Sequence, residues 1–169
     1  GDPSPVTAYG VFMGMKASAK YVYGNDSLKG KAVAVQGIGK VGWHLVEHLH
    51  KEGAKIYVAD ISEHNLKRAA SEFGATVVDG HDLFDLNIDI FAPCAMGAVL
   101  NTDSISRLKC QIIAGAANNQ LEHEDEHGNM IKDKGMVYAP DFLINAGGLI
   151  NVYSEHTGYK REIAMSETE

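Results

Sequence analysis

The chain has little cysteine, little basic charge and no long apolar run, and each shortage excludes a class of protein. Its 169 residues contain two cysteines, Cys94 and Cys110, which are too few for a disulfide framework and lack metal-ligand spacing. Acidic residues outnumber basic ones by 22 to 15, and the net charge of -7 gives no general attraction to nucleic acid or anionic membranes. Without a transmembrane-length run or an opening signal peptide, we expect one domain over residues 1–169 in a reducing cytoplasm.

Histidine is more plentiful, with eight residues, and it raises the question of a metal site. His44 and His48, and again His123 and His127, have the i, i+4 spacing of one helix face. No carboxylate or cysteine completes a persuasive ligand set at either place, and the acidic stretch 122–127 is interpreted as a surface turn. We therefore expect no structural metal.

The most informative segment is a strand, a glycine turn, a helix and a second strand that ends in an acid. Gly37, Gly39 and Gly42 match G-x-G-x-x-G, and an apolar strand precedes them. The first glycine permits a tight turn, the second lets the backbone approach a pyrophosphate, and the third lets the helix pack closely on the strand. The N-terminus of that helix directs free N–H groups and a positive dipole end at phosphates. This context predicts a dinucleotide site.

The acid that ends the second strand, Asp60, indicates which dinucleotide is bound. A carboxylate there can accept hydrogen bonds from both adenosine ribose hydroxyls, which favours NAD. The alternative is a solvated acid at a strand end or at the start of the next helix. His64, Lys67 and Arg68 follow closely and would suit a 2′-phosphate, but we interpret them as the solvated face of a helix.

Strands alternate with helices along the rest of the chain, which predicts a Rossmann-type, doubly wound α/β fold with a mostly parallel sheet and helices on both faces. A helix capped by Ser4 or Thr7 is expected to run to about Tyr23, and a later one to begin at Ser62 or Asn65 and end by Gly74. Further helical stretches are expected near residues 40–51, 82–84 and 142–155, and another is expected to begin at residue 102 or 103. Strands are expected near residues 31–36, 55–59, 75–78, 87–92, 111–114 and 136–138.

Four separate segments follow strand ends, where ligands of such sheets bind. They are the glycine turn, residues 94–97, residues 116–119 and the segment from Asp141 onwards. Asn118 and Asn119 can each donate and accept, which suits a ribose hydroxyl, a carboxamide or an amine; they can equally be turn asparagines. Asn145 precedes a glycine pair inside an apolar helix, which indicates either a nearby ligand or close packing.

These segments resemble the nucleotide domain of the leucine/phenylalanine branch of the amino acid dehydrogenases, over nearly the whole chain. The resemblance implies NAD-dependent, reversible oxidative deamination of an L-amino acid to a 2-oxo acid and ammonium. It rests on five motifs in order: residues 1–11, 33–42, 91–97, 115–121 and 138–148.

The resemblance also implies roles for individual residues. Thr7 and Asn145 would hold the nicotinamide carboxamide, and Asn118 would lie near the nicotinamide ribose and the substrate, with Asn119 as its competitor. Leu149 and Val152 would line the substrate pocket with the two asparagines. The full cofactor set would be Thr7, Gly37, Gly39, Lys40, Val41, Gly42, Asp60, Ile61, Cys94, Ala95, Met96, Ala116, Asn118 and Asn145.

One departure from the family pattern matters for activity. The family's two lysines and its proton-transferring aspartate belong to a first domain that would precede Gly1, so we expect a fragment that binds NAD without turnover. The parent enzyme would be a homo-oligomer. Leucine at position 149, together with residues 94–96 and 116–119, favours phenylalanine over leucine as substrate. A non-enzymatic NAD(H)-sensing module is a further alternative, because it would share the glycine turn and Asp60.

Overall fold

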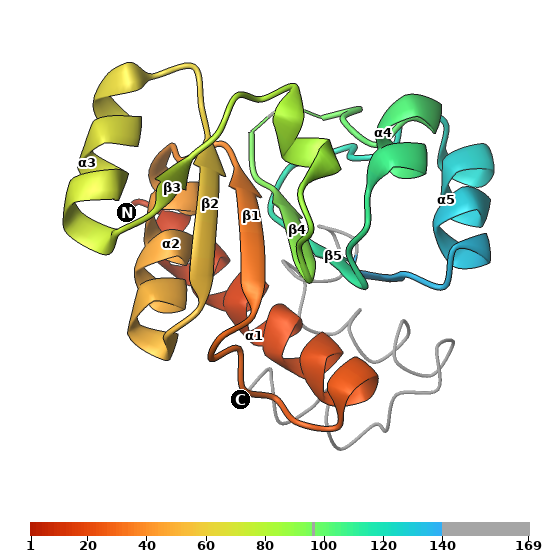
Figure 1. Ribbon diagram of the computed structural model, residues 1–169, viewed down its shortest axis with the longest axis horizontal. Coiled ribbons are helices and arrows are strands. Elements are labelled where there is room, and N and C mark those ends of the chain that lie inside the picture. The colour runs from red at the N-terminus through yellow and green to blue at the C-terminus, as the bar shows by residue number, and fades with distance from the viewer. Residues whose placement is uncertain (96, 140–169) are drawn as a thin grey trace.

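The computed structural model describes residues 1–95 and 97–139 and shows a six-stranded sheet in the order β3-β2-β1-β4-β5-β6 (Figure 1). All neighbouring strands are parallel. The order reverses between β1 and β4, so the carboxyl ends of these strands flank a topological switch point. The predicted doubly wound α/β fold is confirmed. The strands are β1 (Ala32–Gln36), β2 (Lys55–Ala59), β3 (Thr76–Val77), β4 (Ile90–Pro93), β5 (Ile112–Ala114) and β6 (Val137–Ala139).

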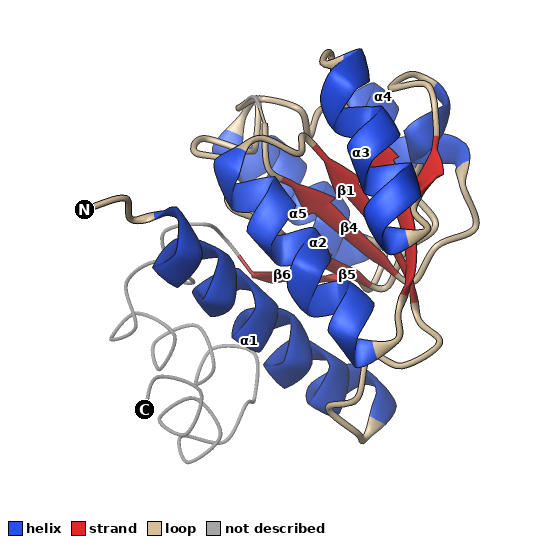
Figure 2. Cartoon of the chain, turned by 90° about the vertical axis from the view of Figure 1, so that its left-hand side faces the viewer, coloured by secondary structure: helices blue, strands red, loops and turns tan. Residues whose placement is uncertain are grey.

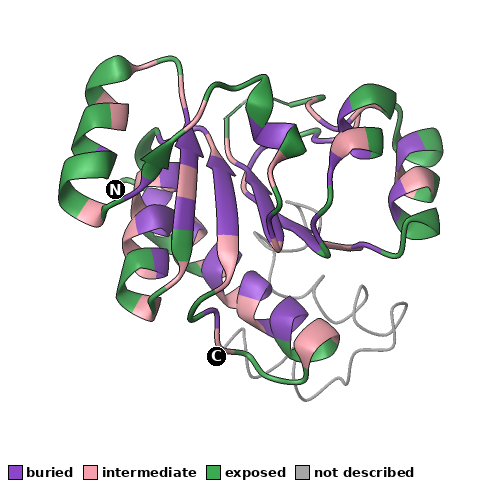
Figure 3. Ribbon diagram, viewed as in Figure 1, coloured by how far each residue is buried: buried purple, intermediate pink, exposed green. Residues whose placement is uncertain are grey.

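Helices cover both faces of the sheet, each over its own apolar cluster. On one face lie α1 (Ser4–Tyr23), α2 (Lys40–Glu52) and α3 (Glu63–Phe73), with α1 packed along α2 (Figure 2). On the other lie the 3₁₀ helix η1 (Asp82–Asp85), α4 (Thr102–Arg107) and α5 (Glu124–Asp133). Side chains of β1 alternate between the clusters, with Val33 and Val35 facing the first and Ala34 the second. Figure 3 shows the resulting buried centre of the sheet.

Two of the described helices, α3 and α4, begin with a side-chain cap. Ser62 caps α3, where its Oγ accepts the Asn65 N–H at 3.2 Å. The prediction that Ser4 or Thr7 caps α1 is wrong, because α1 begins at Ser4 and has no side-chain cap of that kind. Instead, the Asp2 carboxylate accepts the Ser4 N–H at 3.0 Å. Proline in the first turn removes one of the N–H donors that would need a cap.

The stretch 122–127 is exposed as expected, apart from His127, but it is not a turn: helix α5 begins at Glu124. Three acidic residues occupy the first turn of α5, where the helix dipole favours negative charge. His127 is 1% exposed, lies 3.1 Å from the Thr102 hydroxyl through Nε2, and accepts the His123 N–H through Nδ1 at 2.9 Å. Its Nδ1 therefore satisfies a free donor at the helix start.

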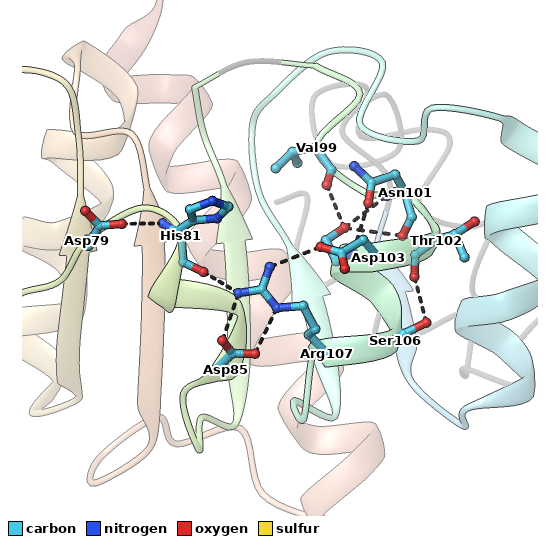
Figure 4. A network of polar contacts seen from close by, with 10 residues as sticks. Asp79, His81, Asp85, Val99, Asn101, Thr102, Asp103, Ser106 and Arg107 are labelled. Carbon is cyan, nitrogen blue, oxygen red and sulfur yellow. Dashed lines mark hydrogen bonds and ion pairs between the residues drawn. The ribbon is translucent and has the colours of Figure 1, made fainter.

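A network around Arg107 joins η1 to α4 (Figure 4). The Arg107 guanidinium donates to Asp85 at 2.8 and 2.9 Å, to Asp103 at 3.1 Å and to the carbonyl of His81. It also lies 5.4 Å from the centre of the Phe84 ring. These contacts connect consecutive crossovers on one face of the sheet and give Arg107 a structural role.

Candidate functional site

The glycine turn connects the end of β1 to α2 and contacts the segment that follows β4. Gly37 has φ of 96°, in the left-handed region that favours glycine. A Cβ at this position would lie 2.4 Å from the Cβ of Ala95. The Gly37 N–H donates to the carbonyl of Ala59 at 2.8 Å, which holds the turn against the end of β2. The neighbouring ends of β1, β2 and β4 therefore meet at this turn.

The other two glycines have opposite surroundings. A Cβ at Gly42 would lie 1.9 Å from the Gly37 carbonyl oxygen, so the start of α2 packs directly on the turn. A Cβ at Gly39 would meet no described atom within 4 Å. Gly39 is also the N-cap of α2 and provides no side-chain cap, which leaves the first N–H groups of the helix available. Packing explains Gly42, whereas open space beside unpaired donors distinguishes Gly39 and fits a phosphate ligand.

Asp60, directly after β2, is part of the same turn. Its carboxylate accepts the Ile38 N–H at 2.6 Å and the Ser62 N–H at 2.7 Å, one on each oxygen. Each carboxylate oxygen keeps a further lone pair for an incoming hydroxyl. The next residue, Ile61, is fully exposed at 104% and offers an apolar surface beside the acid. Contact of Asp60 with a ribose stays a prediction, and the geometry leaves its carboxylate able to make it.

An open groove of about 330 Å³ borders the turn between α2 and α3. Arg68 lies in it, but its guanidinium stacks 4.3 Å over the Trp43 ring and pairs with Glu72 at 3.0 Å. This agrees with the interpretation of Arg68 as part of a helix surface. The groove is lined by Ile38, Gly39, Lys40, Trp43, His44, Asn65 and Arg68.

The ends of β4 and β5 are in close contact beyond the sheet. The Ala117 N–H donates to the Pro93 carbonyl at 3.0 Å, and a Cβ at Gly115 would lie 2.2 Å from that oxygen. Burial raises the pKa of the Cys94 thiol to about 11, although a hydrogen bond from the Ala116 backbone acts in the other direction. The Cys94 thiol is therefore protonated at neutral pH and lies between the two strand ends.

Asn118 and Asn119 are both exposed after β5 but differ in backbone conformation. Asn119 has φ of 51°, and its carbonyl accepts the Ala98 N–H at 2.5 Å. Asparagine tolerates this left-handed conformation, so the turn alone explains residue 119. The same turn does not explain Asn118, which keeps the predicted role near the nicotinamide ribose as a hypothesis.

The sequence-based reasoning missed Gln120, which is 1% exposed at the end of this segment. Its Nε2 donates to the carbonyl of Gly115 at 3.2 Å and to that of Ala117 at 2.8 Å. A glutamine directly before Leu121, in a segment otherwise rich in small residues, was the available signal. Its partners are backbone carbonyls, which residue types do not reveal.

The start of α1 lies near the start of α2. Hydrogen bonds from Ser4 lower the pKa of the Asp2 carboxyl, with smaller contributions from the charges of Lys40 and His44. Thr7 is half-buried in the next turn of α1, and Lys40 is exposed in the first turn of α2. The structure therefore brings the glycine turn, Asp60 and the ends of β4 and β5 together at the carboxyl ends of the strands. The role of Thr7 stays a prediction. Predicted residues outside the described ranges are Met96, Asn145, Leu149 and Val152.

Two further properties of the described residues bear on the expected class of protein. Within residues 1–95 and 97–139, no three histidine, cysteine or acidic side chains are grouped to hold a metal ion. Over the same described residues, no helix combines the length and apolar character needed to cross a membrane.

Comparison with known proteins gives a consistent family. The model of the glutamate/leucine/phenylalanine/valine dehydrogenases matches residues 2–65 and 57–169. Leucine dehydrogenase from Thermoactinomyces intermedius is 58% identical over all of this chain and 46% of its own length. The crystal structure of L-tryptophan dehydrogenase from Nostoc punctiforme superposes with a TM-score of 0.85 at 47% identity, over 99% of this chain and 51% of that one. The chain thus spans about half the length of these relatives.

The comparisons do not support the preference for phenylalanine. Phenylalanine dehydrogenase from Lysinibacillus sphaericus is 43% identical over 99% of this chain and 45% of its own length, against 58% for the leucine dehydrogenase. The preference for phenylalanine rested on Leu149 and two short segments. No contact among the described residues ties those segments to a substrate side chain, so they do not outweigh the higher identity to leucine dehydrogenase over the whole chain.

Proposed function

The chain belongs to the glutamate/leucine/phenylalanine/valine dehydrogenase family, and from that premise we propose that it is the NAD-binding part of an L-amino acid dehydrogenase. The enzyme converts an aliphatic L-amino acid, leucine foremost, to the 2-oxo acid and ammonium. One observation carries the cofactor assignment: Gly39 faces open space at the uncapped start of α2, beside the carboxylate of Asp60.

Each part of the cofactor has residues that suit it. The N–H groups of Lys40 and Val41 at the start of α2 suit the pyrophosphate, since a helix N-terminus attracts anions. Asp60 suits the adenosine ribose and disfavours a 2′-phosphate by charge repulsion, so NAD is preferred to NADP. Exposed Ile61 gives the adenine an apolar surface.

The nicotinamide half belongs at the ends of β4 and β5. We expect a cofactor crevice beyond these strand ends, bordered by Cys94, Ala95 and Ala116, with exposed Asn118 close by. The family resemblance assigns Thr7 of α1 to the same half of the cofactor. Bound NAD supplies the hydride acceptor of the reaction. The described residues offer no buried acid or base at this position, so proton transfer falls to the substrate domain that the family resemblance implies.

Leucine is favoured over phenylalanine by the higher identity to leucine dehydrogenases. In the complete enzyme that contains this chain, kcat/KM for L-leucine should exceed that for L-phenylalanine. One methylene in an apolar pocket changes specificity by about 10- to 200-fold, so the preference should lie in or above that range. A higher kcat/KM for phenylalanine would restore the assignment that residues 94–96 and 116–119 favour.

Calorimetric titration of the chain with NADH and with NADPH tests the cofactor assignment. We expect saturable one-to-one binding of NADH and much weaker binding of NADPH. Asp60→Ala should weaken NADH binding, because it removes the hydrogen-bond acceptor. It should also narrow the difference between the affinities for NADH and NADPH, because it removes the repulsive charge. The exposed acid Glu63 on the next helix provides a matched control, and Glu63→Ala should change neither affinity. Equal binding of both dinucleotides by the unmodified chain would contradict the role given to Asp60.

A further inference from the structure

Gln120 is buried at the end of the segment that follows β5, and none of the assigned roles uses it. Only 1% of it is exposed, and both N–H bonds of its carboxamide are directed at backbone carbonyls of the preceding segment, those of Gly115 and Ala117. The residue's own carbonyl accepts the Leu100 N–H at 2.9 Å. Gln120 thus connects the segment after β5 to the segment after β4.

The other atom of the same carboxamide shows that packing alone does not explain this residue. The Oε1 of Gln120 is buried and has no hydrogen-bond partner among the described residues. Burial of an unpaired acceptor is unfavourable, and an apolar side chain of similar size would avoid it. The glutamine contributes two donated hydrogen bonds, which an apolar residue cannot make.

Those hydrogen bonds act on the segment after β5, which the proposed function assigns to the nicotinamide half of the cofactor. The Ala117 N–H is bonded to the Pro93 carbonyl, and the Ala116 backbone to the Cys94 thiol. Asn118 follows immediately and is exposed at the carboxyl end of β5. Any shift of the carbonyls that Gln120 holds would therefore move Asn118 relative to the end of β4.

We infer that Gln120 is a positioning residue for the nicotinamide half of the cofactor, holding residues 115–117 so that Asn118 is placed at the crevice. The inference rests on the proposed function. It predicts a selective effect, because the adenosine and pyrophosphate contacts come from α2 and from Asp60, on the other side of β4. ADP-ribose, which lacks the nicotinamide, should be insensitive to Gln120.

The test compares NADH and ADP-ribose binding by calorimetry for the unmodified chain and Gln120→Met. Methionine keeps the length and volume of the side chain but donates no hydrogen bond. We expect NADH binding to weaken about tenfold, because the intramolecular hydrogen bonds that hold residues 115–117 are lost, and ADP-ribose binding to stay within twofold. Gln111→Met is the matched control, since exposed Gln111 lies at the opposite end of β5 and pairs with Tyr23 at 2.9 Å.

Each outcome decides between the inference and the function beneath it. If the unmodified chain binds neither compound, the proposed function fails. If it binds both, an unchanged NADH affinity in Gln120→Met would overturn the inference. Equal losses of affinity for NADH and ADP-ribose in that variant would also overturn it. So would equal affinities for NADH and ADP-ribose in the unmodified chain, because the nicotinamide would then contribute nothing to binding. A fall in thermal stability with equal losses for both would identify Gln120 as a folding residue only.

Discussion

At the scale of single residues, three glycines in one turn have three different surroundings. Gly37 needs its positive φ, Gly42 needs the absence of a Cβ against the Gly37 carbonyl, and Gly39 needs neither. The spacing of the motif is enough to predict the role of each glycine, because dinucleotide-binding turns share one geometry. Gln120 was not predictable in this way, because its hydrogen bonds go to backbone carbonyls that no residue type marks.

The different surroundings lead to a prediction that separates folding from binding. Gly39→Ala should leave the free energy of unfolding within about 1 kcal/mol of the unmodified value, since its Cβ meets no described atom, yet it should weaken NADH binding strongly. Gly42→Ala should lower the free energy of unfolding by about 1–3 kcal/mol because the new methyl group overlaps the Gly37 carbonyl. Chemical denaturation combined with NADH titration measures both. Similar stability losses in the two variants would contradict this assignment.

At the scale of elements, the sequence predicted existence and order far better than local detail. Helices α2 and α3 are found where apolar periodicity and caps indicated them, and β1 and β2 differ from expectation by one residue or less. The failures have a physical cause in tertiary contacts. The helix α5 looks like a turn in isolation, with its acidic residues and a glycine, but His127 caps it from within and packs against Thr102 of α4.

The α1–α2 pair predicts a pH effect on stability. His48 of α2 stacks on Phe12 of α1 with ring centres 5.1 Å apart, and burial there lowers the pKa of His48 below its ordinary value of 6.5. Below pH 6.5 the unfolded chain takes up this proton more readily than the folded chain, so the free energy of unfolding should fall as pH is lowered.

Chemical denaturation at several pH values between about 7.5 and 5 measures this effect, because that range brackets the ordinary pKa of histidine. His48→Phe should make the free energy of unfolding less dependent on pH, whereas His64→Phe at an exposed position of α3 should leave the dependence unchanged. An identical pH dependence in His48→Phe and the unmodified chain would show that the α1–α2 contact does not control it.

At the scale of the whole molecule, each apolar layer contains one thiol. Cys94 packs against the layer of α1 and α2, and Cys110 is part of the layer of α4 and α5. Burial raises the pKa of Cys94 to about 11 and that of Cys110 to about 12. In an unfolded chain these thiols ionise near pH 9. In the folded chain both thiols stay protonated above that pH.

This difference predicts loss of stability in alkali. The contribution of the two thiols is fully present below pH 9, and the free energy of unfolding should fall as pH rises towards 11 and 12. In Cys110→Ala, the free energy of unfolding should fall less steeply with rising pH than in the unmodified chain. Thiol labelling at pH 8 should be slow for both cysteines until the chain unfolds. Rapid labelling of Cys110 in the folded chain would show that its layer opens readily.

The central claim is that a dinucleotide binds across the carboxyl ends of the parallel strands, with its phosphates at the glycine turn. The most direct measurement is an NMR titration of the ¹⁵N-labelled chain with NADH, because it reports the position of the ligand at each amide. We predict saturable shifts at Gly39 to Gly42, at Ile61 and at residues 115–119, and none at residues 29–31 or 53–55, at the opposite edge of the sheet. Saturable shifts at that opposite edge, or none anywhere, would contradict the account.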